Sequence, residues 1–281
     1  MTFNNSRSLL VFFYRFFLMA LSNVFQSSIT SMNRKNPAIQ CIGLTKGFGN
    51  KLVFQDIRFS VKKGHILALV GPNGAGKTTL LKIFASLIVP TGGRALVCGH
   101  DVIKNSIRAK RKIGFVPSEE RSFYWRLSGR QNLRFFASLH NIQGQERNRR
   151  VNAALEAVGL GDKGNIRFSE YSSGMKQALG IARGILHDPP ALLLDEPTRS
   201  LSPDVAGKVR KLINNKAKKE GKAVLIASHN LKEVEDLADG ISIIHHGVIK
   251  ALGSLSDLKT LAGISPSADL HSLFKHFTHN Y

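Results

Sequence analysis

Cysteine and acidic residues are both scarce in this sequence. Its 281 residues include two cysteines, Cys41 and Cys98, which are far apart and form no CxxC pair. This argues against a disulfide framework or a zinc site and fits a reduced, cytosolic setting. Asp and Glu number 19 against 40 Lys and Arg, a net charge of +21. The excess favours anionic partners such as lipid head groups, although no basic–aromatic nucleic-acid module is visible.

The N-terminal part lacks acidic residues before Asp56, and it lacks an uninterrupted apolar run. Leu9 to Leu21 is strongly apolar, but Arg15 interrupts it, and crossing a membrane takes about twenty apolar residues. The same arginine and the absence of a small-x-small site argue against a secretory signal. We expect residues 1–32 to form a leader outside the fold. The alternatives are an organellar transit segment, an interfacial helix with its arginines near head groups, and a start of translation at Met32.

A glycine-rich loop follows a short apolar run. Its sequence GPNGAGKTT fits the pattern G-x-x-x-x-G-K-[ST] and consists of Gly71, Pro72, Asn73, Gly74, Ala75, Gly76, Lys77, Thr78 and Thr79. Ile66 to Val70 predicts a buried strand before the loop, and Leu80 to Leu87 predicts a helix after it. Backbone N–H groups in such a loop turn toward phosphates. We expect Lys77 to reach the β- and γ-phosphates of a nucleotide and Thr78 to bind Mg²⁺.

Polar residues stand at the ends of two further apolar runs. Leu192 to Leu194 predicts a buried strand that ends at Asp195 and Glu196, and Ala223 to Ala227 predicts another that leads to His229. Asp195 at the strand end is expected to hold Mg²⁺. Glu196 is placed to polarise an attacking water. In a parallel sheet His229 falls at the same edge, where it is expected to contact the γ-phosphate.

The segment YSSGM, Tyr171 to Met175, lies between these two groups of motifs. Ser172 and the N–H groups near Gly174 precede a stretch, 176–186, that reads as a helix. A helix N-terminus with a serine cap is a ready anion site. By itself the pattern is that of an ordinary helix cap, so its meaning depends on the motifs around it.

In order and spacing, these motifs resemble those of the ATP-binding subunit of an ABC (ATP-binding cassette) transporter. The resemblance covers residues 39–261. It includes Walker A at 71–79, Walker B at 192–196 and the switch histidine, His229. Residues 171–175 correspond to the family signature LSGGQ. Phe48 corresponds to the aromatic residue that stacks on adenine, and an edge-strand core residue is the alternative there.

The resemblance implies an α/β fold. This is a P-loop NTPase cassette with a mostly parallel core sheet, a small antiparallel β-subdomain and a helical subdomain. We place the cassette at residues 37–262 and its helical subdomain at 118–171. Apolar residues at helical spacing between Asp269 and Phe277 predict that residues 263–281 form a helical tail packed against the cassette.

The resemblance also implies a function, an ATP-binding and ATP-hydrolysing subunit that powers a separate transmembrane permease. One Walker A motif and one signature occur, so a second cassette is needed, either a copy or a similar chain. Ser172 and Gly174 would then contact the γ-phosphate of the partner's ATP. The chain would sit at the cytoplasmic face of a membrane, and its C-terminal Leu…Phe pattern favours export. The alternative is an ABC ATPase that acts on the ribosome or nucleic acid, which the charge supports and the single cassette opposes.

Several positions depart from the family pattern. Ser173 and Met175 replace a glycine and a glutamine of the signature. Ser118 stands where the Q-loop glutamine is expected, and Ser202 stands where the D-loop has aspartate. These changes concern coupling between the two ATP sites and to the membrane. The residues expected to act in hydrolysis are unchanged, so hydrolysis remains the expectation.

Aromatic residues gather after the Q-loop position. Phe123, Tyr124 and Trp125 lie beside arginines, and they are expected either to form a core cluster or to contact the permease, which the family places in this region. The segment 134–136 and Leu139 continue at helical spacing and are expected in the core.

Overall fold

The computed structural model describes residues 37–119 and 122–279. The predictions for residues 1–32 therefore lie outside the described residues. Within the described ranges the chain forms two β-sheets and a set of helices around them. None of the helices in these ranges combines the length and the apolar content needed to cross a bilayer.

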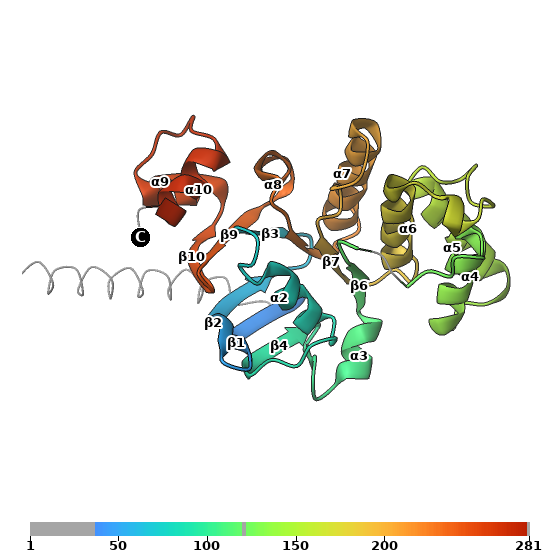
Figure 1. The fold of residues 1–281 in the computed structure, drawn as a ribbon, viewed down its shortest axis with the longest axis horizontal. Coiled ribbons are helices and arrows are strands. Elements are labelled where there is room, and N and C mark those ends of the chain that lie inside the picture. The colour runs from blue at the N-terminus through green and yellow to red at the C-terminus, as the bar shows by residue number, and fades with distance from the viewer. Residues whose placement is uncertain (1–36, 120–121, 280–281) are drawn as a thin grey trace, which may run out of the picture. The chain divides into compact units, whose positions relative to one another are not determined.

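Six strands form a mostly parallel sheet in the order β10-β9-β3-β8-β7-β6 (Figure 1). They are β3 (Ile66–Val70), β6 (Ile113–Val116), β7 (Ala191–Asp195), β8 (Ala223–Ala227), β9 (Gly240–His245) and β10 (Val248–Gly253). All neighbours pair in parallel except β9 and β10. β3, β7 and β8 are buried along their whole length, which explains why the sequence shows them as continuous apolar runs.

Four strands form a second, antiparallel sheet in the order β2-β1-β4-β5. They are β1 (Ile39–Phe48), β2 (Lys51–Val61), β4 (Gly92–Val97) and β5 (His100–Asp101). A tight turn joins β1 to β2, with Phe48 paired opposite Lys51. Together the two sheets confirm the predicted α/β fold with a mostly parallel core sheet and an antiparallel part.

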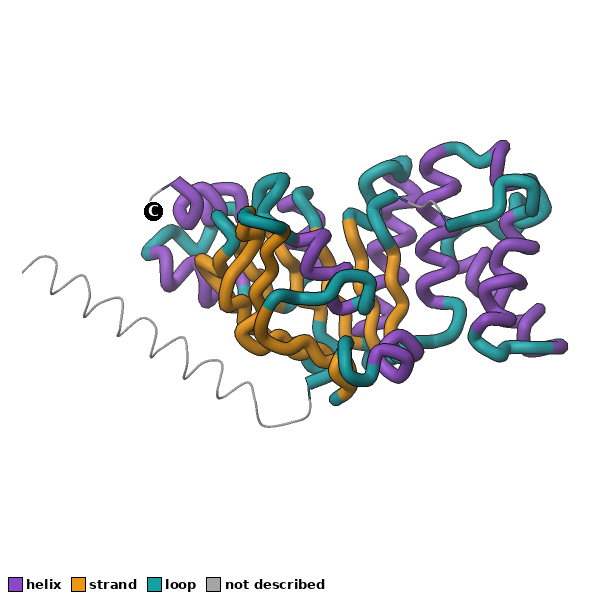
Figure 2. Tube along the Cα trace, turned by 60° about the horizontal axis from the view of Figure 1, so that its bottom comes forward, coloured by secondary structure: helices purple, strands orange, loops and turns teal. Residues whose placement is uncertain are grey.

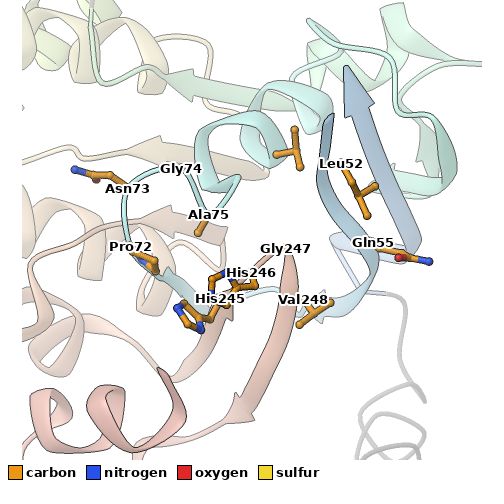
Figure 3. A pocket seen from close by; sticks show the side chains of 11 residues that line it. Leu52, Gln55, Pro72, Asn73, Gly74, Ala75, His245, His246, Gly247 and Val248 are labelled. Atoms are coloured by element: carbon orange, nitrogen blue, oxygen red, sulfur yellow. The ribbon is translucent and has the colours of Figure 1, made fainter. Parts of the chain in front are cut away.

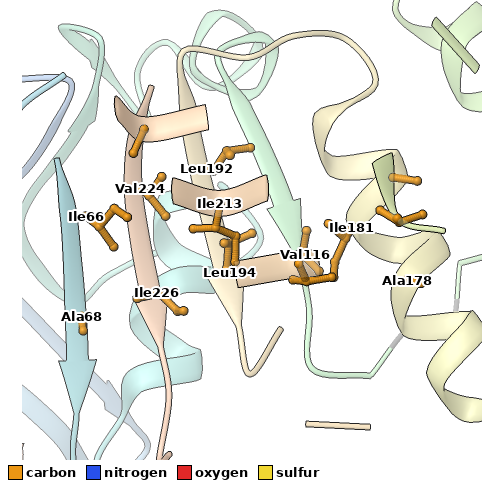
Figure 4. Packing of buried hydrophobic residues seen from close by; sticks show 14 of the residues in the cluster. Ile66, Ala68, Val116, Ala178, Ile181, Leu192, Leu194, Ile213, Val224 and Ile226 are labelled. Carbon is orange, nitrogen blue, oxygen red and sulfur yellow. The ribbon is translucent and has the colours of Figure 1, made fainter. Parts of the chain in front are cut away.

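The described residues also form helices, some of which cover the two faces of the six-stranded sheet. They are α2 (Lys77–Phe84), α3 (Ser106–Arg111), α4 (Gly129–Leu139), α5 (Gly144–Ala157), α6 (Ser173–Ile185), α7 (Pro203–Lys218), α8 (Leu231–Leu237), α9 (Leu255–Ala262) and α10 (Leu270–His279), with a short 3₁₀ turn, η1 (Phe168–Glu170). Leu192 and Leu194 share one apolar cluster with Ile213 of α7 (Figure 4). Leu193, between them, shares a second cluster with Leu80 of α2 and the antiparallel sheet. The alternation along β7 divides the core into two layers.

The helices α4, α5 and α6 pack together into a helical segment at one edge of the six-stranded sheet, and α6 lies beside β6 (Figures 1 and 2). Phe123 is its aromatic centre, 4% exposed, with ring centroids 5.0 Å from Phe168 and 5.5 Å from Phe136. Trp125, by contrast, is 60% exposed. The predicted aromatic cluster is therefore divided between core and surface. The expectation that 134–136 and Leu139 lie in the core is wrong except at Phe136, which is partly buried. Arg134 and Phe135 are exposed, and Leu139 ends α4 with 64% of its area exposed.

Helix α6 joins the helical segment to the sheet through direct contact with β6. A side-chain carbon at Gly114 of β6 would lie 2.0 Å from the carbonyl oxygen of Gly184 in α6, so the two backbones touch with nothing between them. Beyond α6, His187 Nε2 lies 3.1 Å from the carbonyl oxygen of Ile113. The ring of His187 also stacks on His140, at the end of α4, with centroids 3.8 Å apart.

Candidate nucleotide site

The carboxyl ends of three parallel strands bring most of the predicted nucleotide-binding residues together. β3 runs into the phosphate loop, β7 ends at Asp195 with Glu196 next, and β8 ends shortly before His229. β8 lies between β3 and β7, and Asp195 is the register partner of Ala227. Because parallel strands end at the same edge of a sheet, Lys77 at the start of α2 shares this edge with the two acids and the histidine.

The phosphate loop, residues 71–76, turns in a way that requires glycine. Gly74 and Gly76 have φ of 84° and 94°, a left-handed conformation that glycine adopts without steric cost. Gly71 lies against β9, where a side-chain carbon would be 2.3 Å from the carbonyl oxygen of Ile244. The loop then passes directly into α2, whose first N–H groups have no partner within the helix. This arrangement suits an anionic ligand.

Lys77 folds back over the phosphate loop. Its Nζ donates to the carbonyl oxygen of Gly71 at 2.6 Å and to that of Pro72 at 3.1 Å. Burial lowers the pKa of Lys77, and the nearby charges of Glu196 and Asp195 oppose that shift. The ammonium group is thus held at the mouth of the loop, between its carbonyl oxygens and the acids at the end of β7.

Two side-chain contacts hold this edge of the sheet together. Thr78 Oγ1 donates to the carboxylate of Asp195, 2.9 Å from Oδ2 and 3.2 Å from Oδ1. Glu196 Oε1 lies 2.7 Å from Nδ1 of His229. Glu196 has a φ of 50°, and its N–H donates to the carbonyl oxygen of Ala227 at 2.9 Å. A left-handed backbone is costly for a non-glycine residue and is often found at functional sites.

A pocket of about 420 Å³ opens beside the phosphate loop (Figure 3). Its walls come from β2, the loop and the β9–β10 turn, and they consist of Leu52, Val53, Gln55, Pro72, Asn73, Gly74, Ala75, His245, His246, Gly247 and Val248. Phe48 does not line it. Phe48 is 50% exposed in the β1–β2 hairpin, with Lys46 Nζ 4.4 Å from its ring centre. This exposure rules out the edge-strand core alternative, and the stacking of Phe48 on adenine stays a prediction.

The signature residues lie at the start of α6, the helix that packs beside the edge strand β6. Ser172 is the N-cap of α6, and its side chain accepts a hydrogen bond from the Met175 N–H at 3.2 Å. Gly174 packs on the loop after β7, where a side-chain carbon would be 2.9 Å from the carbonyl oxygen of Ser200. Ser172 is exposed, so the cap faces outward from this chain.

The sequence pattern of the ABC transporter family matches residues 54–199, which include both Walker motifs and the signature. The chain belongs to this family. It is 40% identical over 219 residues to the uncharacterized ABC transporter ATP-binding protein YdbJ of Bacillus subtilis (strain 168), a match that covers 78% of this chain and 70% of YdbJ. It is 39% identical over 209 residues to the bacitracin transport ATP-binding protein BcrA of Bacillus licheniformis, covering 74% of this chain and 67% of BcrA.

Solved structures agree with this assignment. A structure described as the ATP binding subunit of an ABC transporter superposes with a TM-score of 0.80 at 28% identity, covering 85% of this chain and 99% of the other. The dimeric ATP-binding cassette MJ0796, in a post-hydrolysis state bound to ADP and Pi, superposes with a TM-score of 0.71 at 23% identity, covering 77% and 98%. The second likeness concerns the fold alone.

The predicted ABC family and the predicted ATPase function are therefore confirmed. The chain is an ATP-binding subunit of the ABC transporter family, and its enzymatic activity is that of an ABC ATPase. The named relatives do not favour the alternative of an ABC ATPase acting on the ribosome or nucleic acid.

The structure also shows where two of the departures from the family pattern lie. Ser118 follows β6 and is half-buried, and Ser202 is the N-cap of α7, where it makes no side-chain cap hydrogen bond.

Sequence reasoning missed His246, which lines the pocket from the β9–β10 turn. The dipeptide His246-Gly247, with φ of 48° and 74°, is the signal that could have revealed this turn.

Proposed function

We propose that this ABC subunit hydrolyses ATP with Glu196, His229 and Lys77 to drive export through a separate permease. The observation that carries the catalytic part is the 2.7 Å contact between Glu196 and His229 at the edge of the sheet that holds the phosphate loop. A carboxylate and an imidazole beside a phosphate-binding loop are suited to orient water and to sense the terminal phosphate. Phosphoryl transfer needs mainly such positioning and charge stabilisation.

Each residue at this edge of the sheet has its own role in the proposed reaction. Lys77 leaves the carbonyl oxygens it now binds and reaches the β- and γ-phosphates. Glu196 accepts a hydrogen bond from the attacking water and polarises it. His229 contacts the γ-phosphate while it keeps Glu196 in place. The backbone N–H groups of residues 71–79 surround the phosphates, and Phe48 stacks on adenine.

Mg²⁺ fits the oxygen donors of Thr78 and Asp195. Their contact at 2.9 Å places a hydroxyl and a carboxylate together, and Mg²⁺ is bound by few protein oxygens together with substrate phosphates and water. The described residues contain no group of three or more His, Cys, Asp or Glu able to hold a metal, which agrees with a site completed by ATP. When bound, Mg²⁺ neutralises charge on the β- and γ-phosphate oxygens.

A second cassette completes the site in this proposal. Ser172 and Gly174 form the N-terminal end of α6, which faces outward, and a helix N-terminus binds phosphate oxygens readily. We assign them to the γ-phosphate of ATP held by the partner, a copy of this chain or a similar one. The dimeric form of the structurally similar cassette MJ0796 supports this arrangement.

Export rests on the relatives and on the tail. BcrA is named for bacitracin transport, and the Leu…Phe pattern falls on α10, where Leu270, Leu273 and Phe277 are buried. We propose a cassette at 37–262, with its helical subdomain at 118–171 and a tail at 263–281. Together with a transmembrane permease, it would sit at the cytoplasmic face of the membrane.

Replacing Glu196 tests the catalytic proposal. Glu196→Gln keeps the size of the side chain but removes the base, so we expect kcat for ATP hydrolysis to fall about 100-fold or more. ATP binding should persist, and the ATP-bound dimer should accumulate in size-exclusion chromatography. Glu235→Gln, on the exposed side of α8, is the matched control and should behave as the wild type. An unchanged hydrolysis rate in Glu196→Gln would show that Glu196 is not the base.

A further inference from the structure

Glu233 is a carboxylate buried in the first turn of α8. It is 2% exposed, although it stands in the charged sequence KEVED. Asn230 caps the helix, and its side chain accepts a hydrogen bond from the Glu233 N–H at 3.2 Å. Removing a carboxylate from water is costly unless hydrogen bonds compensate for it. The partners of this side chain therefore indicate why it is buried.

Those partners come from two different loops. Thr198 Oγ1 donates to Oε1 of Glu233 at 2.7 Å, and Ser228 Oγ donates to Oε2 at 3.1 Å. Ser228 Oγ also accepts a hydrogen bond from the Asn230 N–H at 3.1 Å. Burial raises the pKa of Glu233, and the hydrogen bonds from Thr198 and Ser228 oppose that shift. One carboxylate thus joins the loop after β7 to the loop after β8.

The same two loops carry the proposed hydrolytic pair. Thr198 lies two residues after Glu196, and Ser228 immediately precedes His229. Glu196 and His229 make side-chain contact across these loops at 2.7 Å. A saturated network of buried polar groups is stiff because each broken bond leaves a group unsatisfied. The Glu233 network therefore fixes the separation of the two backbones that hold the pair.

The loop after β7 also touches the signature helix. Leu201 N–H donates to the Thr198 carbonyl oxygen at 3.1 Å, which closes a turn, and Gly174 of α6 packs on Ser200 within that turn. One path of contacts from the signature to the hydrolytic pair thus passes the turn that Thr198 closes. A second contact joins α6 to the same loop, where Gln177 Nε2 donates to the carbonyl oxygen of Pro197 at 3.5 Å, next to Glu196. Ser202, where the family's D-loop has aspartate, makes no side-chain cap hydrogen bond at the start of α7.

We propose that Glu233 is a positioning residue that sets the geometry of Glu196 and His229 and links them, through Thr198, to the signature helix. The proposal rests on the roles proposed above for Glu196 and His229. Glu233 does not touch the reacting atoms in this scheme, since it acts through the two hydroxyl groups that it binds.

Steady-state ATPase kinetics of the purified full chain would test this assignment. Glu233→Ala removes the link and Thr198→Val removes one arm of it without changing side-chain shape. We expect each to lower kcat about 10- to 100-fold, because small misplacements of catalytic groups are costly. The KM for ATP should stay within about 2-fold, because the phosphate loop is untouched. The double variant should be no slower than Glu233→Ala, because both changes break one network.

Two further variants separate positioning from folding. Glu233→Gln keeps the shape and can bind both hydroxyl groups, one through its oxygen and one through its amide nitrogen, so it should retain most of the rate. Glu235→Gln on the exposed side of α8 should leave the rate unchanged. If Glu233→Ala and Thr198→Val keep the wild-type kcat, or if their effects on kcat simply add, the positioning role is wrong.

The variant Glu196→Gln, measured beside these, separates the two proposals. If it abolishes hydrolysis while Glu233→Ala leaves kcat unchanged, only the role of Glu233 is overturned. If Glu196→Gln retains the full rate, the proposed base is wrong, and the role of Glu233 falls with it.

Discussion

The sheet edge beside Lys77 and the signature end of α6 differ in where their polar groups lie. At the strand ends, Thr78 contacts Asp195 and Glu196 contacts His229 within one chain. At α6, Ser172 binds only the N–H of its own helix and is otherwise exposed. One half of the proposed site is therefore assembled within the chain, and the other half is presented outward. On the proposed function, this contrast would explain why one chain holds the nucleotide and a second chain completes the site.

The largest expected effect concerns the packing beneath the signature end. Phe123→Ala removes the ring that packs between Phe136 and Phe168 and should lower the free energy of unfolding by about 3–5 kcal/mol. Leu139→Ala, at a position 64% exposed, should change it by less than about 0.5 kcal/mol. Urea unfolding of both variants measures the difference. Equal losses would mean that the helical segment lacks the core described for it.

Removing the lysine of the phosphate loop should disable the half of the site that one chain provides. Lys77→Ala takes away the cation beside the phosphates, and we expect kcat to fall about 100- to 1000-fold, with weaker ATP binding. Lys82→Ala, in the last turn of the same helix, is the control. ATPase assays and titration with a fluorescent ATP analogue would measure both effects. If Lys77→Ala and Lys82→Ala behave alike, the phosphate loop is not the nucleotide site.

Lowering the pH should lower the free energy of unfolding through His187, which lies between β6 and the end of α4. Burial, together with the neighbouring His140, lowers the pKa of His187 to about 4, below its ordinary value of about 6.5. Between these values the unfolded chain binds the proton that folded His187 rejects, so stability falls as the pH drops. From pH 7 to pH 5 the loss should be about 2 kcal/mol. Urea unfolding at both pH values measures it, and His187→Gln should remove this part of the dependence.

The smallest expected effect concerns two N-cap residues, Ser172 and Ser128, and it tests whether Ser172 does more than cap a helix. Ser172→Ala and Ser128→Ala each remove an N-cap, and each should cost about 1 kcal/mol of stability. Ser128 closes a capping box at α4 and is 8% exposed. Only Ser172→Ala should also weaken ATP-dependent dimerisation, measured by light scattering in the Glu196→Gln background. If both variants dimerise like the parent, Ser172 is only a helix cap.

Much of the fold was predictable because buried strands and phosphate loops leave clear patterns. The limits of β3 and β8 match the predicted runs to the residue, and the phosphate loop lies between β3 and α2 as expected. Helix limits were less accurate. α2 begins at Lys77, three residues before the predicted start, because the helix begins directly after the left-handed Gly76.

Tertiary contacts decided what the sequence pattern left open. Leu139 has the spacing of a core residue but lies where α4 ends and no neighbour covers it. Glu233 stands in the charged run KEVED, and only the fold brings Thr198 and Ser228 to it. Periodicity shows which residues share a face, and the chain elsewhere decides whether that face is covered.

The contact between Gly114 and Gly184 has a mechanical consequence. Side chains that separate a helix from a strand act as a compliant layer, because they change rotamers and absorb displacement. Here the backbones of Gly114 and Gly184 meet directly, so at this point no side chain separates β6 from α6. Strand β6 leads to the Q-loop position, Ser118, and helix α6 begins at the signature residue Ser172. We expect movements of β6 and α6 to be coupled at this contact, and a methyl group added at Gly114 would force the two elements apart.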